Sequence, residues 1–136
     1  MLVPSLRSSA LMIGTAIIHN VFGLLLGLGL VPPPEGPPRN LVGEMLAEGL
    51  LGTAAADPLR MTFFWFEFSG ALFFLLGWSM LDSERRAVPI SAALGWQLLG
   101  LALVGVLLVP ASGLWLLLPQ AALVVRRAQA ATARVG

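Results

Sequence analysis

Long runs of apolar residues limit what this chain can fold into. The first is "ALMIGTAIIHNVFGLLLGLGLV", from Ala10 to Val31, and it contains no carboxylate, lysine or arginine. About 20 helical residues cross a hydrocarbon core of roughly 30 Å, because a helix rises about 1.5 Å per residue. The whole chain is 57% hydrophobic and 11% charged, whereas about a quarter of a soluble domain is charged. We therefore predict an integral membrane protein.

Three further apolar runs complete the predicted architecture, which is an all-α, four-helix bundle in a single membrane domain over residues 1–136. The predicted spans are 10–31, 61–81, 90–109 and 111–125, with a cytoplasmic tail at 126–136. We expect helices because lipid offers the backbone no hydrogen-bond partners. The fourth run is short and contains Pro119, which predicts a tilted or kinked span. The first run exceeds an ordinary signal-peptide core, so we favour a retained span over a cleaved signal.

The arginines predict the orientation. Four spans would place two arginines on one side, Arg39 and Arg60, and the other six on the opposite side. Because arginine is enriched in cytoplasmic loops, we expect both termini in the cytoplasm. The predicted location is the cell (inner) membrane, which the chain crosses several times.

The predicted outer loop, residues 32–60, is the only long connection. It opens with "VPPPEGPPRN", which cannot form a helix. In "LVGEMLAEGLL" the apolar positions Val42, Leu46 and Leu50 recur every four residues, which is typical of a short amphipathic helix at the interface or over the bundle. Glu44 and Glu48 lie on another face, which we interpret as solvated.

Polar side chains inside the predicted spans are the candidate functional residues. Glu67 interrupts the aromatic run "FFWFEFSGALFFLLGW", and His19 is the only histidine. An ionisable group at membrane depth is a functional hypothesis by default, because it is costly to leave unpaired in lipid. The candidate ligand-binding residues are His19, Asn20, Trp65, Glu67, Trp96, Gln97 and Gln120.

Glycines share helix faces with these polar residues. Gly23 and Gly27 follow His19 on one face of the first span, and Gly70 and Gly77 follow Glu67 on one face of the second. Small residues allow helices to approach closely, so we predict that both polar residues point into the bundle. Depths counted along the helices place a polar layer near the midplane, with Glu67 above it on the outer side. A structural hydrogen bond between helices remains the alternative for each.

The sequence also resembles a known family. The segments "FWFEFSGALFFLLGW", "ERRAVP" and "LGWQLLGLALVGVLLVPASGLWLLLPQ" resemble a family of small bacterial four-span membrane proteins of unknown function, and "LVPASGLWLLLP" is the most specific piece. The likeness covers the first span and most of residues 64–120. It implies four spans and supplies no activity.

Three functions remain open. We expect a non-enzymatic protein that binds a lipid-like or hydrophobic ligand between helices, or an accessory subunit of a membrane complex. The alternative is an acid–base isomerase or cyclase for an apolar terpene- or sterol-like substrate, with Glu67 as proton donor, His19 as relay and Trp65 or Trp96 stabilising a cation. A proton-coupled transporter protomer is the third.

The residue types exclude several classes of site. One histidine and no cysteine do not supply the three or four ligands of an ordinary zinc site, so we expect no metal and no cofactor. Scattered arginines give no nucleic-acid footprint. Membrane lipid is the expected partner, and a homo-oligomer or a membrane-protein partner stays open.

Overall fold

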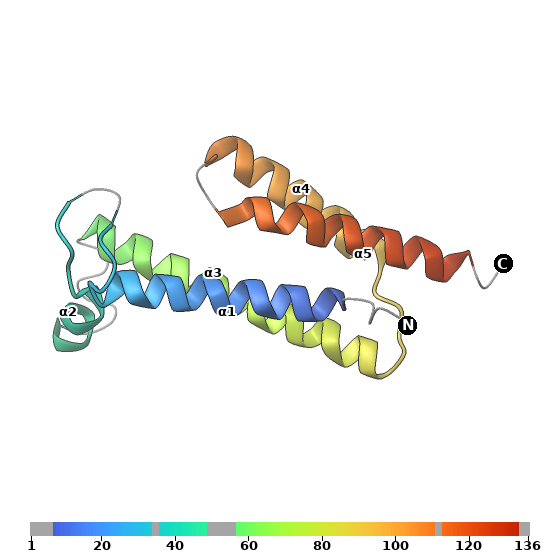
Figure 1. Ribbon diagram of the computed structural model, residues 1–136, viewed down its shortest axis with the longest axis horizontal. Coiled ribbons are helices and arrows are strands. Elements are labelled where there is room, and N and C mark those ends of the chain that lie inside the picture. The colour runs from blue at the N-terminus through green and yellow to red at the C-terminus, as the bar shows by residue number, and fades with distance from the viewer. Residues whose placement is uncertain (1–6, 34–35, 49–56, 111–112, 134–136) are drawn as a thin grey trace, which may run out of the picture. The chain divides into compact units, whose positions relative to one another are not determined.

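The computed structural model describes residues 7–33, 36–48, 57–110 and 113–133, and all regular structure in these ranges is helical (Figure 1). The all-α class is therefore confirmed. The chain divides into two compact units, one made of Met1–Thr15 with Leu75–Gly136 and the other of Ala16–Phe74. In chain order the elements are α1 (Ser8–Gly27), α2 (Leu41–Glu48), α3 (Pro58–Arg85), α4 (Ala92–Leu108), the short 3-10 helix η1 (Gly113–Leu116) and α5 (Leu117–Thr132).

The first three predicted spans correspond to α1, α3 and α4, with shifted ends. α1 stops at Gly27, short of the predicted Val31, because Gly29 adopts a left-handed conformation (φ 73°) and Leu30 N–H bonds back to Leu25 O. α3 is longer than predicted. Both α1 and α3 are long and apolar enough to cross a membrane.

The fourth run is built differently from a kinked span. η1 precedes α5, and Pro119 is the third residue of α5. A proline in the first helical turn removes an N–H that would have no intrahelical partner, so this residue sits where the backbone tolerates it. α5 continues through Arg126 and Arg127 to Thr132, so most of the segment predicted as a tail is helical.

In the unit Ala16–Phe74, the C-terminal part of α1 packs antiparallel against the N-terminal part of α3. Gly27 faces Phe63, Gly23 faces Phe66 and Glu67, and Gly70 faces His19 and Asn20. A Cβ atom added to any of these three glycines would collide with the facing side chain. Close approach at glycine is therefore confirmed for both helices.

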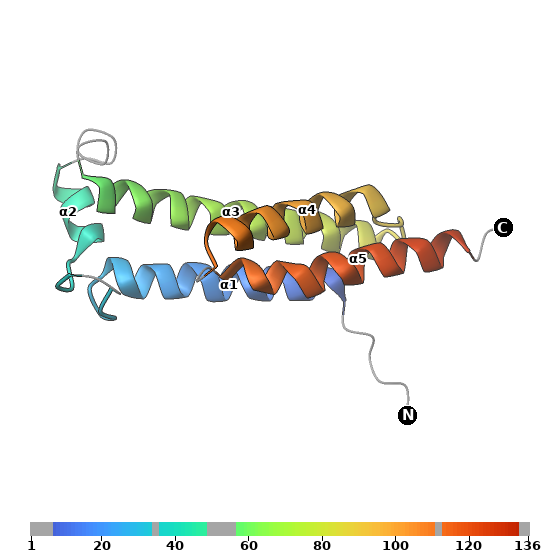
Figure 2. The same cartoon turned by 90° about the horizontal axis from the view of Figure 1, so that it is seen from above.

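The other unit brings together the two ends of the chain. α4 and α5 lie side by side (Figure 2), and Gly95 of α4 contacts Val125 and the Ala121 carbonyl of α5. The N-terminal part of α1 joins them, because Gln120 Nε2 donates to Thr15 Oγ1 at 2.5 Å. The end of α3 is tied to the first turn of α1, since Ser9 Oγ donates to Glu84 Oε2 at 2.5 Å and Ser9 N–H to Oε1 at 3.4 Å.

α2 confirms the predicted short helix, but its packed face is different. Leu41 and Met45 are buried, whereas Leu46 is 74% exposed. Leu50 lies outside the described residues. Glu44 and Glu48 pair with arginines, because the loop before α2 and the start of α3 bring Arg39 and Arg60 to them, while the Glu48 side chain stays 47% exposed.

The C-terminal caps of α1 and α3 generate a matched prediction. After both helices, an N–H bonds back to the carbonyl five residues earlier, as Val88 N–H does to Ser83 O after α3. The residue in the left-handed conformation is Gly29 after α1 and Ala87 (φ 55°) after α3. A left-handed alanine costs about 1 kcal/mol relative to glycine. We expect Ala87→Gly to raise the free energy of unfolding by about 1 kcal/mol.

Gly29→Ala should lower it by at least as much, because its new Cβ would also lie 3.1 Å from the Arg39 carbonyl oxygen. Equilibrium unfolding of the purified chain measures both changes. Effects of the same sign would show that the cap conformation does not control stability.

Candidate functional site

His19 lies at the contact between α1 and α3. Its Nε2 is 2.9 Å from the Phe66 carbonyl oxygen and 3.4 Å from Ser69 Oγ. Because a carbonyl oxygen only accepts, Nε2 carries the proton and donates it to this bond. The imidazole stacks on the Phe66 ring, with centroids 3.7 Å apart and planes 14° apart, and meets Phe73 edge-on. The ring is thus held on three sides by α3.

Asn20 and Glu67 flank His19, and each has a side-chain oxygen without a hydrogen bond. Within the described part of the chain, Asn20 Oδ1 and Glu67 Oε1 are buried and have no hydrogen-bond partner. Each is seated on a glycine of the facing helix, Asn20 against Gly70 and Glu67 against Gly23. An unsatisfied buried polar atom costs about 1–3 kcal/mol, so two of them side by side in one helix pair require an explanation.

We call His19, Asn20, Glu67 and Ser69 the polar seam. Two of its donors are used internally, because His19 Nε2 and Ser69 Oγ both donate to Phe66 O. Its buried polar atoms without a partner among the described residues are two oxygens. The seam is therefore suited to accept hydrogen bonds from a group that enters it.

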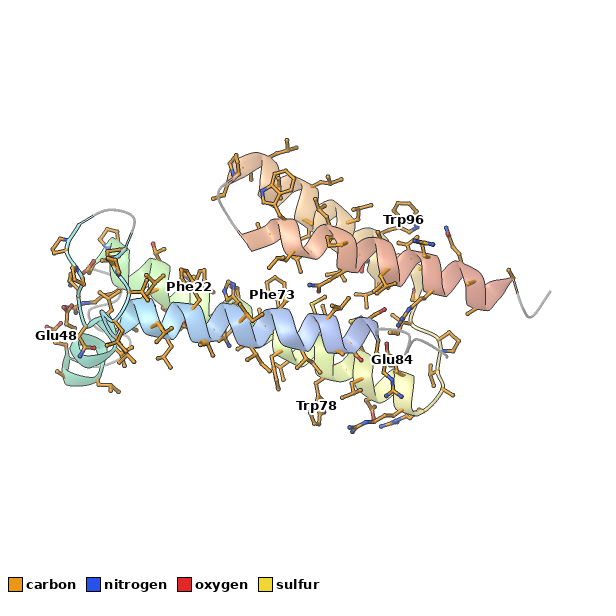
Figure 3. The ribbon with its side chains drawn as sticks, viewed as in Figure 1. Phe22, Glu48, Phe73, Trp78, Glu84 and Trp96 are labelled. Atoms are coloured by element: carbon orange, nitrogen blue, oxygen red, sulfur yellow. The ribbon has the colours of Figure 1, made fainter. Side chains whose placement is uncertain are left out.

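Trp65 lies in the same unit as the seam, whereas Trp96, Gln97 and Gln120 belong to the other unit. Trp65 is 57% exposed on α3. Trp96 is 56% exposed and Gln97 is also exposed on α4, so within their own unit neither lines an interior site (Figure 3). Gln120 is buried, donates to Thr15, and leaves its Oε1 without a partner among the described residues.

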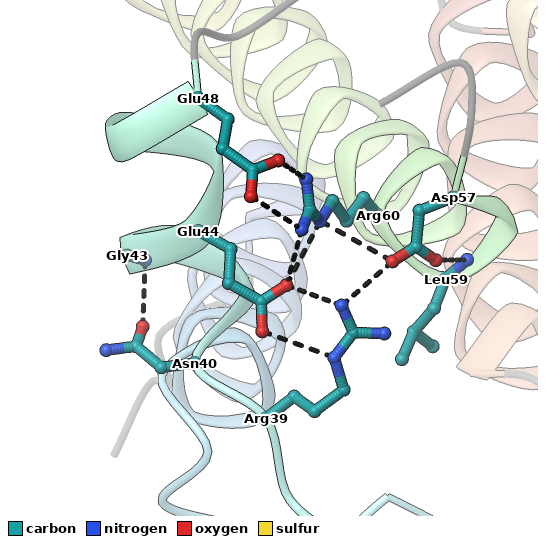
Figure 4. Close-up of polar contacts among 8 residues, drawn as sticks. All are labelled: Arg39, Asn40, Gly43, Glu44, Glu48, Asp57, Leu59 and Arg60. Carbon is teal, nitrogen blue, oxygen red and sulfur yellow. Dashed lines mark hydrogen bonds and ion pairs between the residues drawn. The ribbon is translucent and has the colours of Figure 1, made fainter. Parts of the chain in front are cut away.

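A charged cluster that sequence reasoning missed lies at the end of the seam's unit. Arg60, only 9% exposed, bonds to Glu48 and lies 2.9 Å from Glu44 Oε2. Arg39 bonds to Glu44 at 2.5 Å and to Asp57 at 2.8 Å (Figure 4). The acid–arginine composition of the loop was visible in the sequence, but the pairing depends on how α2 lies against the start of α3.

The cluster alters the titration of its members. Hydrogen bonds from Arg39 hold the pKa of both the Glu44 and the Asp57 carboxyls below their ordinary values, against the opposing effect of desolvation. Hydrogen bonding to Glu48 raises the pKa of Arg60. Among the described residues, no group of three histidine or acidic side chains is arranged to hold a metal ion.

The glycine contacts predict unequal effects of two like substitutions in α1. Gly23→Ala places a methyl group against Phe66 and Glu67, whereas a methyl group at Gly14 meets nothing within 4 Å. Overpacking costs typically 1–3 kcal/mol, and alanine is favoured over glycine in a helix by about 1 kcal/mol. We expect Gly23→Ala to destabilise the protein and Gly14→Ala to leave it unchanged or stabilise it.

Equilibrium unfolding again provides the measurement, and Gly14→Ala is the matched control. If the two variants had equal stability, close contact between α1 and α3 at Gly23 would be refuted.

The charged cluster predicts a pH dependence of α2. Because the folded-state pKa values of Glu44 and Asp57 are lowered, their stabilising contribution is present above the ordinary carboxyl range near pH 4 and is lost as pH falls through the lowered values. Arg39→Gln removes the cause, so loosening of α2 should begin at a higher pH in that variant.

Hydrogen exchange of residues 41–48 between pH 7 and 2.5 measures this onset, after correction for the intrinsic exchange rate. Arg86→Gln serves as the control, since Arg86 pairs with Asp82 at 2.8 Å outside the cluster. An unchanged onset in Arg39→Gln would contradict the assignment.

Comparison with known proteins identifies a family and no activity. A model described as a family of unknown function, DUF6463, matches residues 5–131. Searches of curated proteins and of solved structures gave no match. Because the family model covers nearly the whole chain, the protein belongs to this family of unknown function.

Proposed function

We propose that the chain is a multi-pass membrane protein that binds a lipid-like amphiphile at the polar seam. The observation that carries this proposal is the pair of buried oxygens without partners, Asn20 Oδ1 and Glu67 Oε1. Both accept hydrogen bonds, so the fitting ligand has a head with hydroxyl or amine donors and an apolar body.

The surface of the helices supports membrane insertion. Only 22% of the most apolar window of α1 and 17% of that of α3 are buried inside the protein. The core helix of a soluble protein would be mostly covered, so lipid is the natural solvent for these faces. Exposed large side chains include Ile18 at 66%, Leu72 at 51% and Leu107 at 80%.

Four spans and an inner-membrane topology are part of the same proposal. α4 has 17 residues, about 26 Å of helix, which is at the lower limit for a span. η1 and α5 follow one another without a break from Gly113 to Thr132. The excess of arginine at the predicted inner ends favours cytoplasmic termini.

The binding role accounts for the seam better than the acid–base alternative does. That alternative requires His19 to exchange protons with a substrate, but its protonated nitrogen is committed to the Phe66 carbonyl. The tryptophans proposed to stabilise a cation, Trp65 and Trp96, are both more than half exposed. An accessory role would fill the same acceptors with donors from a partner helix.

The proposal predicts that a bound amphiphile depends on the seam. The protein should fractionate with membranes, with both termini accessible only from the cytoplasmic side. Purified in mild detergent, it should retain an amphiphile that mass spectrometry detects. Asn20→Leu and Glu67→Leu should each reduce the retained amount about tenfold, because each removes a hydrogen-bond acceptor worth about 1–3 kcal/mol when buried.

The control is Ser79→Ala, which alters an exposed hydroxyl of α3 that bonds only within its helix, to Leu75 O. Unliganded Glu67→Leu should also unfold at a higher temperature than the parent, since an unsatisfied carboxyl is replaced by an apolar group. A parent protein that carries no amphiphile, or a Glu67→Leu variant that is less stable, would favour a purely structural seam.

A further inference from the structure

We infer that a second site, a pocket of about 340 Å³ in the unit Met1–Thr15 with Leu75–Gly136, binds a phosphate group carried by an anionic membrane lipid. This inference rests on the proposed membrane placement but not on the polar seam. The pocket lies among the start of α1, the connection between α3 and α4, and the last turns of α5.

Two guanidinium groups and one carboxylate line the pocket, those of Arg7, Arg127 and Glu84. The Glu84 carboxylate is engaged on both oxygens, because Ser9 N–H and Ser9 Oγ bond to Oε1 and Oε2. It also lies 3.8 Å from Arg127 Nη1. Glu84 therefore accepts hydrogen bonds from the first turn of α1. Two arginines against one carboxylate give the pocket a net positive charge.

The first turn of α1 adds to this charge. Ser8 is the first residue of a 20-residue helix and lines the pocket, and Arg127 Nη1 donates to its hydroxyl at 3.3 Å. The N-terminus of a helix carries partial positive charge. Arginine holds phosphate oxygens through paired N–H donors, so the pocket has the chemistry for a phosphate and not for a cation.

The other walls are apolar, which favours a lipid over a free anion. Val88, Pro89 and Ile90 come from the connection, and Val124 and Ala128 from α5. In the proposed topology this connection, the start of α1 and the end of α5 lie at the cytoplasmic surface. Basic pockets between spanning helices at that surface are suited to anionic headgroups.

The experiment measures binding of short-chain phosphatidylglycerol and phosphatidylcholine to the full-length protein in detergent, with inorganic phosphate as a competitor. We expect phosphatidylglycerol to bind more tightly than phosphatidylcholine, and Arg7→Gln and Arg127→Gln each to weaken it about fivefold. The matched controls are Arg86→Gln and Arg126→Gln, which remove the same charge from exposed residues outside the pocket. Both should bind as the parent does.

The outcomes are distinct. Arg127→Gln also removes the bond to Ser8 and can destabilise this unit. If Arg127→Gln proves unstable, binding by Arg7→Gln alone tests the proposal. Full displacement by millimolar inorganic phosphate would assign the pocket to a free anion and overturn the lipid assignment. Equal effects of all four substitutions, or no preference between the two lipids, would overturn the site itself. Loss of the amphiphile from Asn20→Leu or Glu67→Leu, with phosphatidylglycerol binding intact, would separate the two sites.

Discussion

Glycine-mediated contact between α1 and α3 is the interaction on which the rest of the candidate site depends. Gly23 and Gly70 leave room for Glu67 and Asn20, and this room brings the polar atoms of two apolar helices together. A larger side chain at either glycine would separate the helices and uncover the acid and the amide. The glycines thus make it feasible to hold polar chemistry in an apolar pair.

The charged residues are confined to positions that leave the helix faces apolar. Arg39 and Arg60 are taken up by three carboxylates around α2 and the start of α3. Arg127 and Glu84 meet beside the first turn of α1. Between Arg60 and Asp82, α3 carries the single carboxylate Glu67, and α1 carries none. Charges at the helix ends and apolar faces between them fit the proposed membrane placement.

The sequence was sufficient to predict the helices because their signal is local. Long apolar runs, the glycine spacing and the short helix at residues 41–48 are all read from one segment at a time. The pairing of Glu44 and Glu48 with arginines was missed, since it depends on how α2 lies against the start of α3. The packed face of α4 was also not predicted, because nearly all of its residues are apolar and their pattern does not reveal which face packs. Pro119 was expected inside a tilted or kinked span, but it lies in the first turn of α5. The 3-10 turn before it cannot be inferred from hydropathy.

The hydrogen bonds between Ser9 and Glu84 connect residues 75 positions apart in the chain. The first turn of α1 emerges from the ribosome long before the carboxylate that completes it. During synthesis its amide groups must rely on solvent until α3 is nearly finished. The start of the first helix is therefore completed late, and correct placement of the end of α3 becomes a condition for a finished first turn.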